Sequence, residues 1–343
     1  MSAQWAVTER EPEACGGLDG ALELIESGRV HDGMEGLVAS LRKERERLTP
    51  GAWRGFVHDT LRTHPIRRVV HEDPLTSRAF SKPRGYPGDA VTMDFMYGTR
   101  PASAPTRRAA ELYRYTTNGP ASRAMRHRRQ LLARLIDETA AGRRGARVLA
   151  IGCGHLREAE ISAAVREGGL GELVAVDQDA ASLEVVAREY GPLGVRTEHE
   201  SVHGLISGSV ALRGFDLVYS AGLFDALDGR TAGRLCEAMF EAARPGGRVL
   251  LASFLPGIPD AGYMEGLMDW NVVHRSEPEL LGLAGGVPRR RIADLTLSFD
   301  DDENVAYLSI GKKGPPSLAS LTAVEAEGND ASSRPERRAR AEA

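Results

Sequence analysis

The chain has 343 residues, of which 42% are hydrophobic and 27% are charged, and its formal net charge is −4. This composition is typical of a globular protein with one or two domains, and the negative charge argues against nucleic acid or an anionic membrane as a partner. No apolar run reaches the roughly 20 residues of a membrane span, and the N-terminus lacks the apolar segment of a secretory signal. The cysteines lie far apart, which indicates neither disulfides nor a metal site and favours a cytoplasmic protein.

Apolar residues at helical spacing predict a helical domain over residues 18–142, after a flexible stretch at 1–17. Gly28 and Pro65 are expected to end two of its helices. The segment 80–98, FSKPRGYPGDAVTMDFMYG, is predicted to be irregular because prolines and glycines interrupt it. Two further helices follow, separated by an Asn-Gly-Pro break.

Residues 143–312 change to short apolar strands that alternate with amphipathic helices. The strands lie in ARVLAIGCG, GELVAVDQD, VRTEHES, FDLVYSAG and RVLLASF, and one of the helices is expected over EAEISAAVREG. Such alternation predicts an α/β fold with a doubly wound, Rossmann-like parallel sheet. The segment LTLSFDDDENVAYLSIGKK adds an antiparallel edge hairpin, which makes seven strands. Residues 313–343 are small, polar and charged, and they are expected to form a disordered tail.

A Gly-Cys-Gly turn, Gly152 to Gly154, follows the first strand at the edge where doubly wound sheets bind their ligands. Asp177 ends the second strand, where a carboxylate can accept hydrogen bonds from both ribose hydroxyls of a nucleoside, with Gln178 beside it. A tight turn without a ligand and a helix cap at Asp177 are the alternatives. Leu156 replaces the third glycine of a dinucleotide fingerprint, which disfavours NAD and favours a nucleoside without a pyrophosphate.

The segments VLAIGCG, VAVDQD, FDLVYSAGLFDAL and ARPGGRVLLASF resemble the class I S-adenosylmethionine (SAM)-dependent methyltransferases in order and spacing. The resemblance implies that SAM is the cofactor, that the glycine turn borders its methionine part and that Asp177 holds its ribose. It also implies contacts near the adenine and the sulfonium for Ser201, Val202, Ser220 and Gly222. The family often has an acid two residues before the first glycine, and here that place is Ala150. The amino group of SAM would then need Glu158 or Asp225, unless Glu158 is a solvated helix acid.

The irregular segment is predicted to cover the ligand, because the carboxyl edge of the sheet is otherwise open. Tyr86 would lay its ring against the sulfonium, Arg84 would pair with a carboxylate, and Asp89 would bind an ammonium or act as a base. Packing by Tyr86 and helix capping by Asp89 are the alternatives. This KPRGY-x-GDA motif resembles a bacterial branch of SAM enzymes that includes those of 3-hydroxypalmitate methyl ester synthesis. The branch shares a later segment in which Trp270 is a second wall or a core residue, and Arg275 a site residue or half of a surface ion pair.

Together these residues predict a SAM-dependent methyltransferase that modifies an oxygen or a nitrogen of a small molecule, in specialised metabolism or signalling. His155 follows the glycine turn and is a candidate base, with a residue that only starts a helix as the alternative. The layout also resembles the azetidine-2-carboxylate synthases, which cyclise SAM and release methylthioadenosine. A non-catalytic SAM-binding partner protein is a third hypothesis. The arginines of RAMRHRRQLLAR are interpreted as a solvated helix face.

Overall fold

The computed structural model describes residues 12–100 and 103–315. The predicted tail over 313–343 therefore lies outside the described residues from 316 onward, and so does most of the stretch 1–17 that was expected to be flexible. The first helix begins at Pro12, so that residues 12–17 are helical.

The N-terminal part of the chain is helical, as predicted. Its helices are α1 (Pro12–Glu26), α2 (Val30–Arg47), α3 (Pro50–Phe56), α4 (Ile66–Val70), α5 (Pro74–Ser81), α6 (Ala90–Tyr97), α7 (Arg107–Asn118) and α8 (Pro120–Gly142). A π-helical turn, Val57–Leu61, continues α3. Gly28, with φ +88°, lies in the turn directly after α1, where the sequence predicted a helix end. Pro65 directly precedes α4, so it separates two helices instead of closing the helical run.

The segment 80–98 is only partly irregular, which corrects the prediction made for it. Residues 90–97 form α6, because Asp89 caps its first turn and Gly98 ends it with φ +72°. The irregular part is confined to residues 82–89, which we call the lid loop. It joins α5 to α6 and carries the two prolines and two of the glycines of the motif.

A seven-stranded sheet forms the rest of the molecule, in the order β3-β2-β1-β4-β5-β7-β6. The strands are β1 (Arg147–Ile151), β2 (Glu172–Asp177), β3 (Val195–His199), β4 (Phe215–Ser220), β5 (Ala243–Phe254), β6 (Ile292–Phe299) and β7 (Val305–Lys312). The first five strands are parallel, and β7 is antiparallel to both of its neighbours. The predicted sheet, its seven strands and its edge hairpin are therefore confirmed.

The helices of this part are α9 (Ala163–Arg166), α10 (Ala180–Tyr190), α11 (Val202–Ser207), α12 (Gly229–Ala242), α13 (Ala261–Leu267) and α14 (Glu277–Gly282). One predicted helix, EAEISAAVREG, is broken into a 3₁₀ turn, Arg157–Glu160, and the short α9. The break occurs because Ser162 starts a new helix, its Oγ accepting from the Val165 amide. Asp137 of α8 fixes this start by accepting a hydrogen bond from Ser162 Oγ at 2.6 Å.

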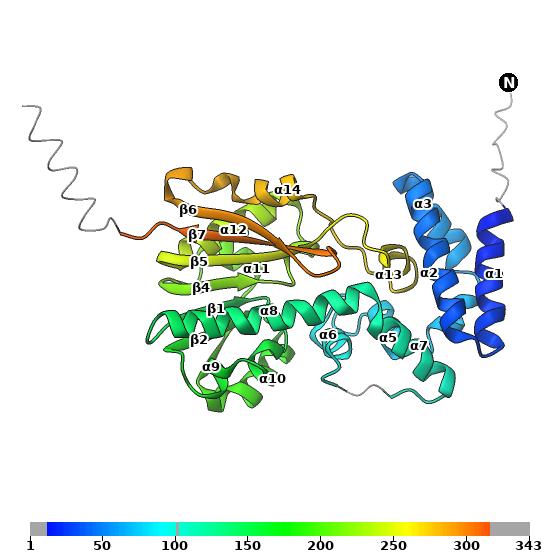
Figure 1. The fold of residues 1–343 in the computed structure, drawn as a ribbon, viewed down its shortest axis with the longest axis horizontal. Helices are drawn as coiled ribbons and strands as arrows, with labels where there is room; N and C mark the ends of the chain where they lie inside the picture. The colour runs from blue at the N-terminus through cyan, green and yellow to red at the C-terminus, as the bar shows by residue number, and fades with distance from the viewer. Residues whose placement is uncertain (1–11, 101–102, 316–343) are drawn as a thin grey trace, which may run out of the picture.

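Alternating side chains of the strands pack into two separate cores, one on each face of the sheet. Val148 and Ala150 of β1 belong to the core under α8, α9 and α10, whereas Leu149 and Ile151 belong to the core under α11, α12 and α14. The first core continues without interruption into the N-terminal helices. Figure 1 shows how α8 runs across one face of the sheet and reaches these helices. The helical domain and the sheet are thus one packed body.

Candidate functional site

A cavity of about 470 Å³ lies between the carboxyl ends of the central strands and the helical domain. Its sheet wall comes from the residues that follow β1, β2 and β4, and its helical wall comes from the lid loop, α6 and α8. Of the predicted site residues, those that line it are Arg84, Tyr86, Gly152, Gly154, His155, Glu158, Asp177, Gln178, Gly222 and Trp270. The cavity falls within the size range of small-molecule sites, roughly 300–1,000 Å³.

The glycine turn after β1 needs both of its glycines. Gly152 and Gly154 have φ angles of +63° and +53°, which side chains rarely adopt. A Cβ at Gly152 would lie 2.5 Å from Cγ of Leu223, and one at Gly154 would lie 3.3 Å from Cβ of Ala90 at the start of α6. The turn therefore brings bare backbone to the cavity and lets the helical domain approach it closely.

Asp177 holds this turn in place. Its Oδ2 accepts a hydrogen bond from the Gly154 amide at 2.8 Å, and its Oδ1 accepts one from the Asp179 amide at 2.9 Å. Helix α10 is capped by Asp179, whose Oδ1 accepts from the Ala181 amide, so the capping alternative for Asp177 is wrong. Burial raises the pKa of Asp177, although its backbone hydrogen bonds oppose that rise. A buried carboxylate with free lone pairs thus faces the cavity.

The lid loop is fixed to the sheet domain at both ends. Arg84 Nη1 donates to Asp179 Oδ2 at 2.7 Å and to Ser182 Oγ at 2.9 Å. The guanidinium of Arg84 therefore already has a carboxylate partner from the protein. At the other end a Cβ on Gly88 would lie 2.6 Å from Cζ2 of Trp270, so the loop backbone rests on the indole ring.

Tyr86 projects from the middle of this loop into the cavity wall. Burial and the negative charges of Asp177, Asp179 and Asp89 raise the pKa of its phenol. The hydroxyl is therefore neutral at every physiological pH. It is also close enough to Asp177, the acid expected at the ribose, to be affected by its charge. The structure places Tyr86 as a lining residue and leaves its contact with a sulfonium a prediction.

Asp89 is a structural residue, which corrects its assignment as a base or an ammonium ligand. Its Oδ1 accepts hydrogen bonds from the Thr92 amide at 2.8 Å and from Arg78 Nε at 3.0 Å. Its Oδ2 accepts from Arg78 Nη2 at 2.6 Å, and the residue is fully buried outside the cavity wall. The helix-capping alternative therefore holds, and the ion pair neutralises the charge.

His155 is oriented by Asp94 of α6, a residue that sequence analysis did not single out. His155 Nδ1 lies 2.8 Å from Asp94 Oδ2, while Nε2 is buried and has no hydrogen-bond partner among the described residues. Burial raises the pKa of Asp94, but hydrogen bonds from His155 and Arg157 outweigh this effect and lower it. Because an ionised carboxylate only accepts, the proton of this hydrogen bond is on Nδ1, and Nε2 is the ring nitrogen without a partner among the described residues.

The wall beyond His155 contains a second group of charged side chains, of which Glu158 is buried and Asp225 is half-buried. Tyr219 donates its hydroxyl proton to Glu158 Oε1 at 2.6 Å, and burial raises the pKa of Glu158. Asp225 Oδ1 accepts from Ser253 Oγ at 2.9 Å, and burial raises its pKa as well. Arg128 of α8 lines the same part of the cavity. Glu158 is therefore not the solvated helix acid of the alternative interpretation.

The sheet has the order 3-2-1-4-5-7-6 with an antiparallel β7. This order is typical of the class I SAM-dependent methyltransferase fold. No protein-family model matches the chain, and no curated protein matches it. Among solved structures the chain is similar to a possible exported protein from Bordetella parapertussis, with 17% identity, a TM-score of 0.52, and coverage of 91% of this chain and 100% of that one.

Two further solved structures are methyltransferases. One is the N-methyltransferase NodS from Bradyrhizobium japonicum in complex with S-adenosyl-L-homocysteine, at 16% identity and a TM-score of 0.41, covering 57% of this chain and 89% of that one. The other is magnesium protoporphyrin IX methyltransferase from Synechocystis with bound S-adenosylhomocysteine, at 11% identity and a TM-score of 0.43, covering 57% of this chain and 88% of that one. At these identities the likeness concerns the fold alone.

Three predicted cofactor residues do not line the cavity. Ser201 caps α11, its Oγ accepting from the Gly204 amide at 3.0 Å, and Val202 starts that helix. Ser220 is the last residue of β4, and its buried Oγ has no partner among the described residues. Arg275 is buried and donates to the carbonyls of Phe224 and Leu227, so it forms no surface ion pair.

The basic segment of α8 is not a solvated face, which corrects its interpretation. Arg126 donates to the Thr117 and Met96 carbonyls, and Arg128 is buried at the cavity. Arg129 is ion-paired with Glu160. These arginines connect α8 to the rest of the protein, and only exposed members such as Arg123 face solvent.

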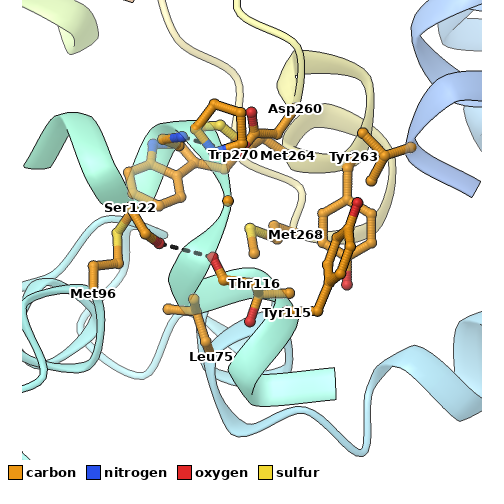
Figure 2. A pocket seen from close by; sticks show the side chains of 14 residues that line it. Leu75, Met96, Tyr115, Thr116, Ser122, Asp260, Tyr263, Met264, Met268 and Trp270 are labelled. Atoms are coloured by element: carbon orange, nitrogen blue, oxygen red, sulfur yellow. Dashed lines mark hydrogen bonds between the residues drawn. The ribbon is translucent and has the colours of Figure 1, made fainter. Parts of the chain in front are cut away.

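A second, smaller cavity of about 30 Å³ lies on the other side of Trp270, within the helical domain. Figure 2 shows its mostly apolar wall, with Met96, Met264 and Met268 among the side chains around it. Asp260 contributes a buried Oδ1 that has no partner among the described residues, while its Oδ2 accepts from the Ala121 amide at 3.0 Å. Burial raises the pKa of Asp260 to about 6.

Among the described residues, the one group of side chains with the spacing of metal ligands is exposed and lies at the start of α2: His31, Asp32 and Glu35. It belongs to neither cavity described above. Within the same residues no helix has the length and apolar character that a membrane crossing requires.

Proposed function

We propose that the protein is a SAM-dependent methyltransferase that modifies a small molecule. The observation that carries this proposal is a set of three carboxylates on the sheet wall, Glu158, Asp177 and Asp225, none of which forms an ion pair with a described arginine or lysine. Buried carboxylates without cationic partners are costly. Arg128 acts on Glu158 and Asp225 only through space, so a ligand that carries both a sulfonium and an ammonium would supply the positive charge in contact with them.

The glycine turn and Asp177 fit the nucleoside end of SAM. Each oxygen of Asp177 accepts one backbone amide and keeps a lone pair for a ribose hydroxyl. Gly152 adopts φ +63° and lines the cavity without a side chain, which leaves the backbone open to a flat nucleoside. Gln178 lies beside this place at the exposed rim of the cavity.

Glu158 and the aromatic side chains fit the other end of the cofactor. A buried carboxylate facing an ammonium forms a charge-assisted hydrogen bond, and the Tyr219 hydroxyl already fixes one oxygen of Glu158 for this role. Tyr86 and Tyr97 line the cavity from the helical side, and Trp270 lines it from the segment that follows α13. An aromatic ring on a cation contributes about 0.5–2 kcal/mol, and the same rings exclude water from the reacting centre. When bound, SAM supplies an electrophilic methyl group.

His155 would serve as the base. Its free Nε2 can accept the proton that an acceptor hydroxyl or amine loses as it is methylated, and Asp94 would stabilise the imidazolium that forms. Arg157, held in two hydrogen bonds to Asp94, keeps that carboxylate ionised and in position. A positioned base of this kind typically contributes about 10²–10⁴-fold to the rate.

The first test is calorimetric titration of the whole chain with S-adenosylhomocysteine. We expect a single site, and we expect Asp177→Ala to weaken it at least about tenfold, which corresponds to about 1.4 kcal/mol. Exposed Asp302→Asn is the control, because Asp302 lies at the surface, where it pairs with Arg123. A wild type that binds no S-adenosylhomocysteine would refute the proposal.

The second test separates the chemistries. The protein is incubated with SAM alone and with a panel of carboxylate, hydroxyl and amine acceptors. Methyl transfer predicts S-adenosylhomocysteine only when an acceptor is present. Methylthioadenosine and a cyclic amino acid from SAM alone would instead identify a cyclase, and tight binding without any product would identify a binding protein.

A further inference from the structure

We propose that Arg128 binds a carboxylate group of the ligand that fills the 470 Å³ cavity, an inference that rests on the proposed function. Arg128 projects from the middle of α8, and its residue exposure is 7%. It lines the cavity together with Tyr97 and Asp225. A guanidinium in this position brings a full positive charge to the ligand.

The contacts of Arg128 leave part of its guanidinium unused. Nη1 donates to the Ala221 carbonyl, and Nη2 donates to the Tyr97 hydroxyl at 2.9 Å and lies 3.6 Å from Met93 Sδ. Nε is buried and has no partner among the described residues. Of five N–H donors in a guanidinium, these contacts use at most three, which leaves the donor on Nε and the second donor on Nη1 without an acceptor among the described residues.

No carboxylate of the described residues forms an ion pair with Arg128. The neighbouring arginines of the site differ in this respect, since Arg84 is paired with Asp179 and Arg157 with Asp94. Arg275 is a useful contrast, because it is also buried and also donates to carbonyls, but it does not line the cavity and leaves no buried nitrogen without a partner. Arg128 alone of these four combines burial, an unused donor and a place at the ligand cavity.

A carboxylate is the ligand group that best complements these features. Burying a guanidinium without an anion in contact is unfavourable, and a carboxylate matches its planar fork in geometry as well as charge. Two sources offer this group: the amino-acid end of SAM itself, or an acceptor that is a carboxylic acid. Both place a carboxylate at Arg128, and they predict different behaviour in binding experiments.

The experiment compares Arg128→Met with wild type on three probes. S-adenosylhomocysteine has an amino-acid end, and 5′-methylthioadenosine lacks it. Hexanoate, added to protein saturated with S-adenosylhomocysteine, represents a carboxylic acid acceptor. If the cofactor supplies the carboxylate, Arg128→Met lowers the affinity for S-adenosylhomocysteine at least about tenfold. It then changes the affinity for methylthioadenosine by less than about twofold. If the acceptor supplies it, hexanoate raises the melting temperature of the wild type but not of the variant.

Arg123→Met is the matched control, because Arg123 lies on the same helix and is exposed; it should bind all three probes like the wild type. Arg128→Lys keeps the charge but loses the fork, so its affinity should lie between wild type and Arg128→Met, and it carries the test if the methionine variant does not fold. An Arg128→Met protein that matches wild type on all three probes overturns this inference alone. A wild type that binds neither nucleoside overturns the proposed function and this inference together.

Discussion

The sheet wall and the helical wall of the cavity hold their acidic groups in different ways. On the helical side Asp94 lines the cavity and is paired with Arg157, and Asp89, buried behind this wall, is paired with Arg78. On the sheet side Asp177, Glu158 and Asp225 accept hydrogen bonds from neutral donors, and burial raises the pKa of each. Neutralised acids stabilise the helical wall whether or not a ligand is present, whereas unpaired acids leave the sheet wall with negative charge that a cationic ligand can offset.

The largest expected effect is at His155, where the two walls meet. We expect His155→Gln to lower turnover about 10²–10⁴-fold, because the base at Nε2 is lost, and to change affinity for S-adenosylhomocysteine less than about threefold. Asp94→Asn should lower turnover too and change its pH profile, since an amide does not stabilise the imidazolium. Formation of S-adenosylhomocysteine with an acceptor measures both. Exposed His58→Gln is the control. Wild-type turnover in His155→Gln would mean that His155 is not the base and only starts a helix.

Asp260 tests the comparison from outside both walls, because it is an acid with a buried oxygen and no ion pair among the described residues, at the start of α13, which packs on α2 of the helical domain. Its pKa rises from 3.8 to about 6 in the folded protein, so the folded state holds a proton that the unfolded state releases. Stability from this group is present below about pH 4 and is lost as the pH rises through about 6, by up to about 3 kcal/mol. Relative to wild type, Asp260→Asn should therefore be more favourable at pH 7 than at pH 4.5.

Urea unfolding at the two pH values measures this difference, with exposed Asp302→Asn as the control. An advantage of Asp260→Asn that is equal at both pH values would mean that the carboxylate titrates normally. A water molecule in the small cavity beside Trp270 would then donate a hydrogen bond to the unpaired Oδ1.

Asp89→Ala should act on stability. It removes the cap of α6, worth about 1 kcal/mol, and leaves Arg78 without its partner, so we expect a loss of about 2–3 kcal/mol in urea unfolding. Asp228→Ala is the matched control, because Asp228 caps α12 through the Thr231 amide at 2.9 Å, is exposed and forms no ion pair with an arginine of the described residues. Equal losses in the two variants would show that the ion pair with Arg78 contributes nothing.

Local features of the site could be predicted from the sequence, and features that depend on packing could not. The glycine turn and Asp177 lie at strand ends, where spacing along the chain fixes their place. Asp177 and Asp179 show the limit of this approach, because either acid of this short stretch can be the helix cap, and only the backbone decides which. In VAVDQD the cap is the second acid, which leaves Asp177 free for the cavity.

Arg128 and Asp94 were missed because their roles depend on how α8 and α6 meet the sheet. A signal for Arg128 was nevertheless present in the sequence. Ala121, Ala124, Met125 and Leu132 are all buried and lie three, four or seven positions from Arg128 on the same helical face. Composition alone does not show which arginine lies on the apolar face of the helix, because several arginines occur in this one segment.

The smallest expected effect is at Glu158. It tests directly whether the acids of the sheet wall bind the ligand or have the structural role of the acids on the helical side. Glu158→Gln keeps the shape of the side chain and an oxygen that can accept from the Tyr219 hydroxyl. It removes a buried carboxyl group whose pKa is raised by burial. The variant should therefore be at least as stable as wild type at pH 7 in urea unfolding. Its affinity for S-adenosylhomocysteine should nevertheless fall about tenfold, or about 1.4 kcal/mol, because the ammonium loses its carboxylate. Methylthioadenosine, which has no ammonium, should bind both proteins equally. If Glu158→Gln lost stability and kept its affinity, Glu158 would belong with the paired acids of the helical wall, and the charge on the sheet wall would have a structural role.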